Sequence, residues 1–384
     1  MTPPQLLLLG CGHSHLFVLE ALARGEMGKV RATLVSPEEE YFYSGMIPGV
    51  IAGCYSPEQA RLRPRRLAAA AGAEFIADTA ERVDAADRRV HLRGGGALDY
   101  NLLSIDIGSR PAGMEIPGAS GHALTVKPMH AALRILPAAR EAIRATGRGR
   151  PAHIVVAGAG AAGVEVALCL DGRLRREAQA GNRHRITLVD AGGEVLAELP
   201  PRSREQAGQI TERRGIRTRL RAPIEEVTGD GLRLSGDGSI GYDVLIWALG
   251  PAAPPLPTVS GLPVDGDGYL LVAPTLRVPG HPLVFGAGDC VRMPEHPWVP
   301  RAGVYAVREG PVLARNLARA LAAESPERYE PQRHWLSLLN TGEGRALLTY
   351  RSIGLHNRPA WWLKDRIDRR FMRRFRTLES SVER

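Results

Sequence analysis

The sequence predicts an α/β protein with two parallel-sheet domains and a small C-terminal α+β extension. A length of 384 residues is enough for two or three domains. A unit of strand, glycine-rich turn, helix and strand occurs twice, starting near residues 5 and 153. Such a repeat is typical of two nucleotide-binding domains. After Glu330 the chain becomes rich in Trp, Arg and Leu, which indicates a third, smaller piece.

The first unit begins with an unbroken apolar run, Gln5–Leu9, which is typical of a strand buried on both faces of a parallel sheet. A helix is expected from about Gly12 to Ala23 and a second strand over Val30–Val35. These elements would form one βαβ crossover. The segment Asp99–Gly108 carries a further strand, which we expect to close this sheet.

The second unit begins with the apolar strand His153–Ala157 and continues through a glycine turn into a helix that reaches Leu170. The strand Arg185–Asp190 completes this unit. The segment Tyr242–Gly250 resembles Asp99–Gly108, and we expect it to close the second sheet. Residues 126–149 have a helical pattern and are expected to link the two domains.

A later segment, Pro282–Asp289, is another strand that ends in a glycine turn. An amphipathic helix is expected from about Ala302 to Ala322, and we assign both elements to the first domain. The predicted first domain is therefore discontinuous, with residues 1–125 and 255–330. The second domain covers 126–254, and the extension covers 331–384 and ends in a basic amphipathic helix.

The second glycine turn has the spacing G-x-G-x-x-G, with Gly158, Gly160 and Gly163. Such a turn between a strand and a helix brings backbone N–H groups and the positive end of the helix dipole to a diphosphate. Asp190 ends the next strand, where its carboxylate can accept both ribose hydroxyls and would repel the 2′-phosphate of NADP. This predicts an NAD(P)H site that favours NADH. The alternative is a turn that serves only strand–helix packing.

The first glycine turn keeps Gly10 and Gly12 but has His15 at its third position. Gly288 and Asp289 follow a returning strand, where a carboxylate can hydrogen-bond the ribityl chain of a flavin. A dinucleotide site with such an acid predicts FAD, so the fold becomes two Rossmann-like domains that bind FAD and NAD(P). The alternative role for Asp289 is a helix N-cap.

Two histidines and a serine, His13, Ser14 and His15, start the helix after this turn. We expect them to hydrogen-bond the FAD phosphates or to shape the turn. The sequence offers no third and fourth ligand beside the H-x-H pair, so no metal site is predicted.

The composition excludes several other classes of protein. The four cysteines form no C-x-x-C pair, which excludes a local zinc cage or dithiol and fits a reducing, cytoplasmic compartment. The net charge is +9, but the basic residues concentrate near the C-terminus without an interleaved aromatic surface, so nucleic-acid binding is not predicted. No run of 18 apolar residues occurs, so no membrane-spanning helix is expected.

Five further motifs carry a resemblance to a known family. They are Gly12–His15, Tyr43–Gly53, Val126–Pro128, Pro300–Gly303 and Trp362–Met372. With both glycine turns, they resemble the pyridine nucleotide–disulfide oxidoreductase superfamily, in the branch that holds type II NADH dehydrogenases and sulfide:quinone oxidoreductases. The likeness is closest to flavoproteins fused to, or found beside, selenophosphate synthetase.

This resemblance implies an FAD-dependent oxidoreductase that passes hydride from NAD(P)H to flavin. Glu165 would lie near the nicotinamide and pass protons, and Lys127 would lie near the flavin ring. The alternative for Glu165 is a helix residue that is capped by the backbone or paired with an arginine. The electron acceptor would approach near Tyr43–Gly53 and Pro300–Gly303.

A quinone is one candidate acceptor. The glutamines of the NADH dehydrogenases in the quinone-facing segment correspond here to a stretch with Gly303 and Glu309. Two rival functions stay open. One is a sulfide- or selenium-handling flavoprotein that uses Cys54, although a free cysteine is more often a small buried hydrophobe. The other is a non-catalytic flavin-binding, membrane-docked partner protein. A homodimer is also left open.

The predicted C-terminal helix, Trp361–Leu378, has an apolar stripe, Leu363, Ile367, Phe371 and Phe375, and seven basic residues. A basic amphipathic helix with tryptophan at one end suits an anionic membrane surface. This would place the protein on the cytoplasmic face of the inner membrane. The alternative is that the stripe packs on the flavin domain and the arginines are solvated.

Overall fold

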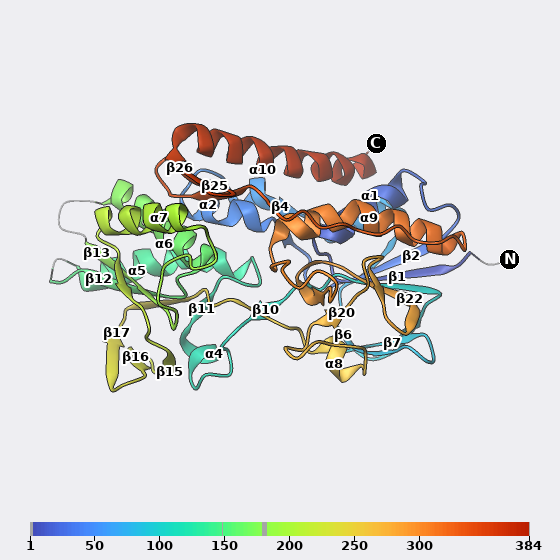
Figure 1. Ribbon diagram of the computed structural model, residues 1–384, viewed down its shortest axis with the longest axis horizontal. Coiled ribbons are helices and arrows are strands. Elements are labelled where there is room, and N and C mark those ends of the chain that lie inside the picture. Colours follow the sequence, from blue (N-terminus) through green and yellow to red (C-terminus); the bar gives the residue numbers. More distant parts are fainter. Residues whose placement is uncertain (1–2, 148, 179–182, 384) are drawn as a thin grey trace.

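The computed structural model describes residues 3–147, 149–178 and 183–383. It contains two main β-sheets that lie side by side, and the C-terminal helix α10 (Arg358–Glu379) runs across the top of both (Figure 1). The predicted α/β fold class, with two Rossmann-like units and a C-terminal α+β piece, is confirmed.

The first sheet has six strands in the order β21-β22-β9-β1-β2-β5. Five of these strands run parallel, and β21 is antiparallel to β22. Residues Leu6–Leu9 are fully buried, as expected for a strand covered on both faces. The strands are β1 (Gln5–Leu9), β2 (Arg31–Val35), β5 (Glu74–Ile76), β9 (Leu102–Ile105), β21 (Arg277–Val278) and β22 (His281–Gly286).

Two helices, α1 (His13–Ala23) and α9 (Gly303–Leu321), lie against each other over this sheet (Figure 1). Gly310 allows the close approach, because a Cβ there would overlap the ring of Phe17. The returning strand and helix therefore belong to the first sheet, as the sequence predicts.

The second sheet has five parallel strands in the order β11-β18-β12-β13-β14. Helix α6 (Ala161–Glu177) connects β12 to β13 and continues beyond the predicted end at Leu170. A three-stranded meander, β15 to β17, packs on the sheet around the buried Trp247. The strands are β11 (Leu124–Thr125), β12 (Ala152–Ala157), β13 (His184–Val189), β14 (Arg217–Arg219), β15 (Ile224–Val227), β16 (Gly231–Leu234), β17 (Gly238–Gly241) and β18 (Val244–Trp247).

Two expectations about these sheets are wrong. Strands β9 and β18 do not close their sheets, because β22 pairs outside β9 and β11 pairs outside β18. The segment 126–149 is helical only in its second part, where α5 covers Ile135–Thr146 after a short 3₁₀ turn over Ala131–Arg134.

The C-terminal extension is an antiparallel sheet followed by a long helix. Strands β24 (Ser337–Asn340), β25 (Ala346–Tyr350) and β26 (Ile353–Asn357) lead into α10. The side chain of Asn357 caps α10 by accepting a hydrogen bond from the Ala360 N–H at 2.8 Å. The domain boundaries at residues 125, 254 and 330 stay a proposal. No helix in the described ranges is both long and apolar enough to cross a membrane.

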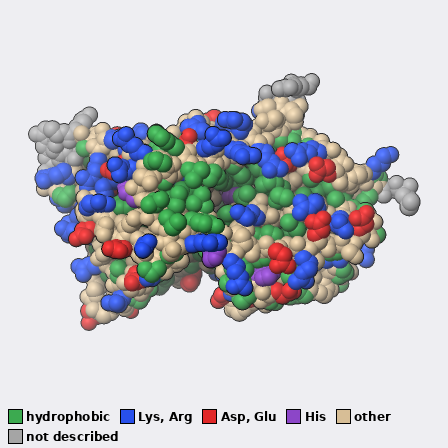
Figure 2. Space-filling model, turned by 45° about the horizontal axis from the view of Figure 1, so that its top comes forward, with side chains coloured by type: hydrophobic (Ala, Val, Ile, Leu, Met, Phe, Trp, Pro, Cys, Tyr) green, Lys and Arg blue, Asp and Glu red, His purple; other side chains and the backbone are tan. Residues whose placement is uncertain are grey.

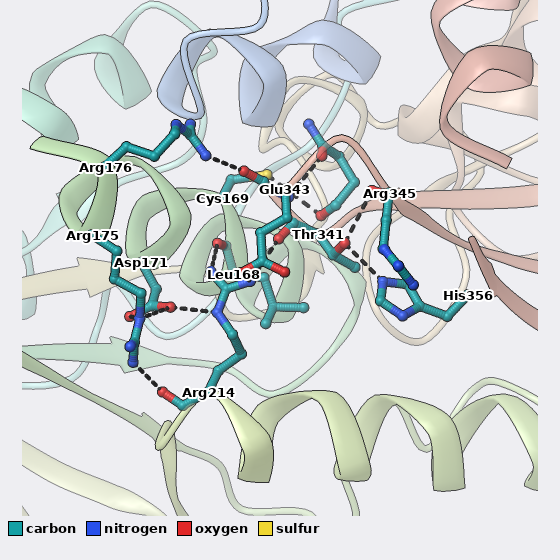
Figure 3. Close-up of polar contacts among 12 residues, drawn as sticks. Leu168, Cys169, Asp171, Arg175, Arg176, Arg214, Thr341, Glu343, Arg345 and His356 are labelled. Atoms are coloured by element: carbon teal, nitrogen blue, oxygen red, sulfur yellow. Dashed lines mark hydrogen bonds and ion pairs between the residues drawn. The ribbon is translucent and has the colours of Figure 1, made fainter. Parts of the chain in front are cut away.

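A buried polar network holds the extension against the second sheet (Figure 3). The guanidinium of Arg214 pairs with Asp171 of α6 at 2.6 Å and with Glu343 of the β24–β25 turn at 2.7 Å. The guanidinium of Arg176 donates to the carbonyl oxygens of Gly342 and Ala52. The network therefore joins three parts of the chain that are far apart in sequence.

The remaining elements are shorter. They are β3 (Tyr41–Phe42), α2 (Ile47–Ile51), β4 (Arg61–Leu62), α3 (Pro64–Ala70), β6 (Ala80–Asp84), β7 (Arg89–Leu92), β8 (Ala97–Asp99), β10 (Arg110–Pro111), α4 (Ala119–His122), α7 (Pro201–Arg213), β19 (Pro251–Ala252), α8 (Leu256–Val259), β20 (Leu270–Leu271), η4 (Gly288–Cys290) and β23 (Val291–Arg292).

Candidate active site

A cavity of about 1010 Å³ opens at the carboxyl ends of β1, β2 and β9. This is the edge at which doubly wound sheets bind ligands. Its walls include five of the predicted FAD residues, together with Cys11 and Asp106, which the sequence did not single out. The five are Gly10, Gly12, His13, Lys127 and Asp289.

The first glycine turn is shaped around Asp106, which directly follows β9. Gly10 has a φ of 84°, and a Cβ at either Gly10 or Gly12 would overlap Asp106. Oδ2 of Asp106 accepts hydrogen bonds from the N–H groups of Ser14 at 2.8 Å and His15 at 3.0 Å. The two glycines therefore allow this carboxyl group to lie at the start of α1.

The side chains of Ser14 and His15 shape the turn and do not line the cavity. The Ser14 hydroxyl donates to the carbonyl oxygen of Ala306 at 2.8 Å. The ring of His15 lies 2.6 Å from the Gly10 carbonyl oxygen and 2.8 Å from the Ser104 hydroxyl. Burial lowers the pKa of His15 to about 4, so its ring is neutral at physiological pH.

Lys127 and Asp289 meet at the wall of the cavity. The Lys127 ammonium pairs with Oδ2 of Asp289 at 2.8 Å and donates to the Ser109 hydroxyl at 2.7 Å. Asp289 is part of η4, whose first residue is Gly288, with a φ of 76°. Asp289 is therefore the partner of a lysine and not the N-cap of a long helix.

His13 is the first residue of α1 and faces an aromatic cluster. Its ring centroid lies 5.7 Å from that of Tyr41, 5.6 Å from that of Tyr43 and 5.9 Å from that of Phe371 on α10. Burial lowers the pKa of His13 to about 4, and Lys127 lowers it further while Asp289 opposes the shift. A neutral ring thus lies between the cavity and the C-terminal helix.

These residues fit FAD. The cavity offers a helix N-terminus behind glycines for a diphosphate, an acid at a glycine turn for the ribityl hydroxyls, and a cation at that acid. Bound FAD supplies two-electron chemistry that no side chain in this wall provides.

The second glycine turn also fits a dinucleotide. A Cβ at Gly158 would overlap the carbonyl of Ala248, and a Cβ at Gly163 would overlap the carbonyl of Gly158, so both glycines serve close packing. A Cβ at Gly160 would meet only the Glu198 carboxylate, at 3.7 Å. Packing therefore does not explain Gly160, whereas the approach of a diphosphate does.

The carboxylate of Asp190 lies at this turn. It accepts hydrogen bonds from the N–H of Ala159 at 2.7 Å and from the N–H of Gly192 at 2.6 Å. Glu198, which the sequence did not indicate, accepts a hydrogen bond from the Ala161 N–H at 2.9 Å. A diphosphate at the start of α6 would compete with Glu198 for this N–H group.

Glu165 belongs to a buried charge cluster with Lys364 and Asp368 of α10. The Lys364 ammonium donates to Asp368 at 3.0 Å and to the carbonyl oxygen of Gly45 at 2.7 Å, and it lies 4.0 Å from Glu165. Burial raises the pKa of Glu165 to about 7, although Lys364 opposes the shift. The Tyr43 hydroxyl also contacts Asp368. Neither Lys364 nor Asp368 was expected to be buried.

Cys54 is half-buried, and burial raises the pKa of its thiol. The thiolate that nucleophilic or redox chemistry needs is therefore disfavoured. Among the residues that the structure describes, no three His, Cys, Asp or Glu side chains are arranged to hold a metal ion.

Comparisons with known proteins agree with this geometry. The model of the family "Pyridine nucleotide-disulphide oxidoreductase" matches residues 4–311. A demethylphylloquinone reductase, NdbB of Synechocystis, is 25% identical over 287 residues, which are 70% of this chain and 69% of the relative. The type II NADH:quinone oxidoreductase NdhA of Mycobacterium tuberculosis is 29% identical over 187 residues, which are 45% of this chain and 40% of the relative.

Two solved structures share the fold over nearly the whole chain. The NDH2 of Plasmodium falciparum, in complex with NADH, superposes with a TM-score of 0.82 at 16% identity and covers 99% of this chain and 98% of that one. The sulfide:quinone oxidoreductase of Aquifex aeolicus superposes with a TM-score of 0.81 at 16% identity, with 98% and 92% covered. From its two dinucleotide sites and this family match, the chain belongs to the pyridine nucleotide-disulphide oxidoreductase family and is an FAD-dependent NAD(P)H oxidoreductase.

Proposed function

We propose that this enzyme oxidises NADH, in preference to NADPH, and passes the electrons through FAD to a quinone at an anionic membrane surface. The proposed FAD residues are Gly10, Gly12, His13, Lys127, Gly288 and Asp289. The proposed NADH residues are Gly158, Gly160, Gly163 and Asp190. The names of the two curated relatives, which are a demethylphylloquinone reductase and an NADH:quinone oxidoreductase, support the choice of acceptor.

One observation carries the membrane part of this proposal. Large apolar side chains are exposed along the first half of α10 and on the adjoining β26, and Figure 2 shows an apolar patch over these elements with basic side chains around it. Trp362 is 67% exposed and Ile353 is 49% exposed. We call this surface the α10 patch, and its residues are Ile353, Leu355, Trp362, Leu363 and Ile367.

The two halves of α10 differ in what their apolar residues contact. In the second half, Phe371 stacks on Tyr43 with centroids 4.4 Å apart, and Met372 and Phe375 are buried. In the first half, Leu363 and Ile367 remain exposed. The apolar stripe thus packs on the protein at one end and faces outward at the other, so each of the two alternatives raised from the sequence describes one half.

Basic side chains accompany the patch. Arg366, Arg370 and Arg373 are exposed on α10, and within the described ranges none of them forms an ion pair with an acid. Each such residue near an anionic surface contributes up to about 1 kcal/mol of binding free energy. Apolar contact together with this charge favours a monotopic position of the helix in the membrane interface.

The buried cluster of Glu165, Lys364 and Asp368 lies beneath this helix, and we infer that it supplies the protons that quinone reduction consumes. A path of contacts leads from it to the cavity, because Asp368 contacts Tyr43 and the ring of Tyr43 neighbours that of His13. With its pKa raised to about 7, Glu165 is suited to release and recover a proton near neutral pH.

The test uses purified holoenzyme with NADH and a quinone, with and without phosphatidylglycerol vesicles. The expected results are bleaching of the flavin absorbance by NADH, its return on addition of quinone, and faster turnover with the vesicles. A flavin that NADH does not reduce, or a reduced flavin that quinone does not reoxidise, would contradict the proposal. The link to selenophosphate synthetase stays a prediction from the sequence.

A further inference from the structure

Two buried carboxyl groups beneath the FAD-binding turns have no part in the proposed electron or proton transfer. Asp106 follows β9 and is 2% exposed, and Glu309 lies in α9 and is 3% exposed. Carboxyl groups are rarely buried to this extent without a cation. Their position beside the site of a negatively charged cofactor requires an explanation.

Both groups contact Gly288, the residue before Asp289. The Gly288 N–H donates a hydrogen bond to Oε2 of Glu309 at 2.7 Å. On its other side, a Cβ at Gly288 would overlap Oδ1 of Asp106. Gly288 is therefore held between the two carboxyl groups, and its turn places Asp289 at the cavity wall.

Asp106 also holds the other turn. Its Oδ2 accepts the N–H groups of Ser14 and His15 at the start of α1. This helix N-terminus is the part of the fold that attracts the FAD diphosphate. A charged Asp106 would repel the diphosphate at close range, whereas an uncharged Asp106 accepts the same two hydrogen bonds without that repulsion.

The charged and titratable neighbours come from several elements. The groups that act electrostatically on Glu309 are Asp106 and Asp289, and Glu309 in turn acts on the Cys290 thiol and the Tyr329 hydroxyl. Lys127 and His13 face Asp289. Arg292 and Arg301 line a small cavity of about 20 Å³ beside Glu309.

The two arginines at this small cavity do not form an ion pair with Glu309. The Arg301 guanidinium lies 3.4 Å from the ring centroid of Tyr269 and pairs with Asp265 at 3.6 Å. For Arg292, the part of the chain that the structure describes shows no ion pair. The small cavity is large enough for about one water molecule, which the protonated form of Glu309 could donate to.

The environment favours the uncharged form of both acids. Burial raises the pKa of Asp106 to about 7 and that of Glu309 to about 8, and Asp289 adds to both shifts. A bound diphosphate would raise both pKa values further, because it adds negative charge at the same place.

We propose that Asp106 and Glu309 are positioning residues that hold the two FAD-binding turns as uncharged carboxylic acids, so that FAD binding is coupled to their protonation. By linkage, the FAD-bound state then holds more protons than the FAD-free state. The affinity for FAD therefore falls as the pH rises above the pKa values of the free protein. The inference concerns cofactor retention and does not depend on which acceptor the enzyme uses.

The test measures FAD release from the holoenzyme between pH 6 and pH 10. Holoenzyme at several concentrations is equilibrated at each pH, the free FAD is separated by ultrafiltration and measured by fluorescence, and circular dichroism confirms that the protein remains folded. We expect the Kd for FAD to rise at least about tenfold from pH 7 to pH 9, since each coupled proton contributes up to tenfold per pH unit.

Glu309→Gln and Asp106→Asn imitate the uncharged acids, so each is expected to bind FAD at pH 7 and to lose one proton from the pH dependence. The matched control is Glu324→Gln, which changes an exposed glutamate just after α9 and should follow the wild type. Glu309→Ala removes the acceptor of the Gly288 N–H and should weaken FAD binding at every pH. Rescue by Gln but not by Ala separates this role from simple packing.

A Kd that does not change between pH 7 and pH 9 in the folded wild type would overturn the proposal. So would a pH dependence that persists undiminished in Glu309→Gln and Asp106→Asn. If one of these variants does not fold, the other decides the question by the same criterion.

Discussion

The backbone N–H of Asn340 donates a hydrogen bond to Oε1 of Glu165 at 2.7 Å. Asn340 ends strand β24 of the C-terminal extension, and Glu165 lies on the first turns of α6. The extension therefore orients a carboxyl group of the unit that carries the NADH-binding turn. It also supplies Lys364 and Asp368, the other two members of the buried cluster.

Replacement of Glu165 by Gln should separate the two halves of the reaction. We expect reduction of the flavin by NADH to be preserved and turnover with quinone to fall by about 10²-fold, the usual cost of losing a general acid. Because the pKa of Glu165 is about 7, wild-type quinone reduction should decline as the pH rises through 7, and this step should be absent in the variant. Stopped-flow spectroscopy measures each half.

The control for this variant is Glu205→Gln, which changes an exposed glutamate of α7 and should leave both rates unchanged. Equal rates in both halves for Glu165→Gln and the wild type would exclude Glu165 from proton transfer.

Removal of apolar surface from the α10 patch should weaken membrane binding. For Trp362→Ser combined with Ile367→Ser, we expect at least about tenfold weaker partitioning into phosphatidylglycerol vesicles, because each large side chain contributes more than 1 kcal/mol when buried. Turnover with a water-soluble acceptor should not change. Cosedimentation with vesicles measures the partitioning.

Val259→Ser is the matched control, since Val259 is 56% exposed on α8, far from α10 (Figure 1). If the α10 variant and this control bind vesicles as tightly as the wild type does, the patch does not contact the membrane.

Asp190→Asn should reduce the preference for NADH. The amide cannot accept both backbone N–H groups that the carboxylate holds, and it no longer repels a 2′-phosphate. We expect the ratio of kcat/KM for NADH to that for NADPH to fall by about tenfold. Steady-state kinetics with both nucleotides provide the ratio, and an unchanged ratio would remove Asp190 from nucleotide selection.

Arg214→Ala should destabilise the fold. It breaks the ion pairs with Asp171 and Glu343 and leaves Asp171 buried, and removal of one partner of a buried pair costs about 3 to 5 kcal/mol. Its neighbour Arg213 is exposed, so Arg213→Ala should change the free energy of unfolding by less than about 0.5 kcal/mol. Urea denaturation measures both values, and similar values would show that the network does not stabilise the fold.

Cys54→Ser should leave NADH oxidation within about twofold of the wild type, because burial disfavours the thiolate. An oxygen-consumption or dye-reduction assay measures the rate. A large loss of activity in a folded variant would instead favour the sulfide- or selenium-handling alternative.

Much of the fold follows from local sequence patterns. The apolar run Gln5–Leu9 and the two glycine turns are short-range signals, and they identify β1, β12 and the helices that follow them. Residues 126–149 mislead, because an amphipathic pattern does not reveal that the first part turns around Pro128 before α5 begins.

The predicted residues of the site depend on the same signals, and the missed residues depend on tertiary contacts. Lys364 and Asp368 lie one helical turn apart on α10 and look like a solvated pair in sequence. They are buried because the Gly45 carbonyl and Glu165, both remote in sequence, lie beneath the helix. Asp106 and Glu309 escaped notice as FAD-site residues for the same reason, since only the return of β22 brings Gly288 between them.

The pairing of β22 with β9 also constrains the order in which the chain folds. Val284 lies opposite Leu103, and the whole second sheet is inserted between these partners. During synthesis the earlier strands must wait for this late neighbour, with one side of β9 uncovered, while the inserted unit has all its own strands and can fold first. A chaperone that shields exposed strand edges should therefore bind nascent chains of intermediate length more than the complete protein.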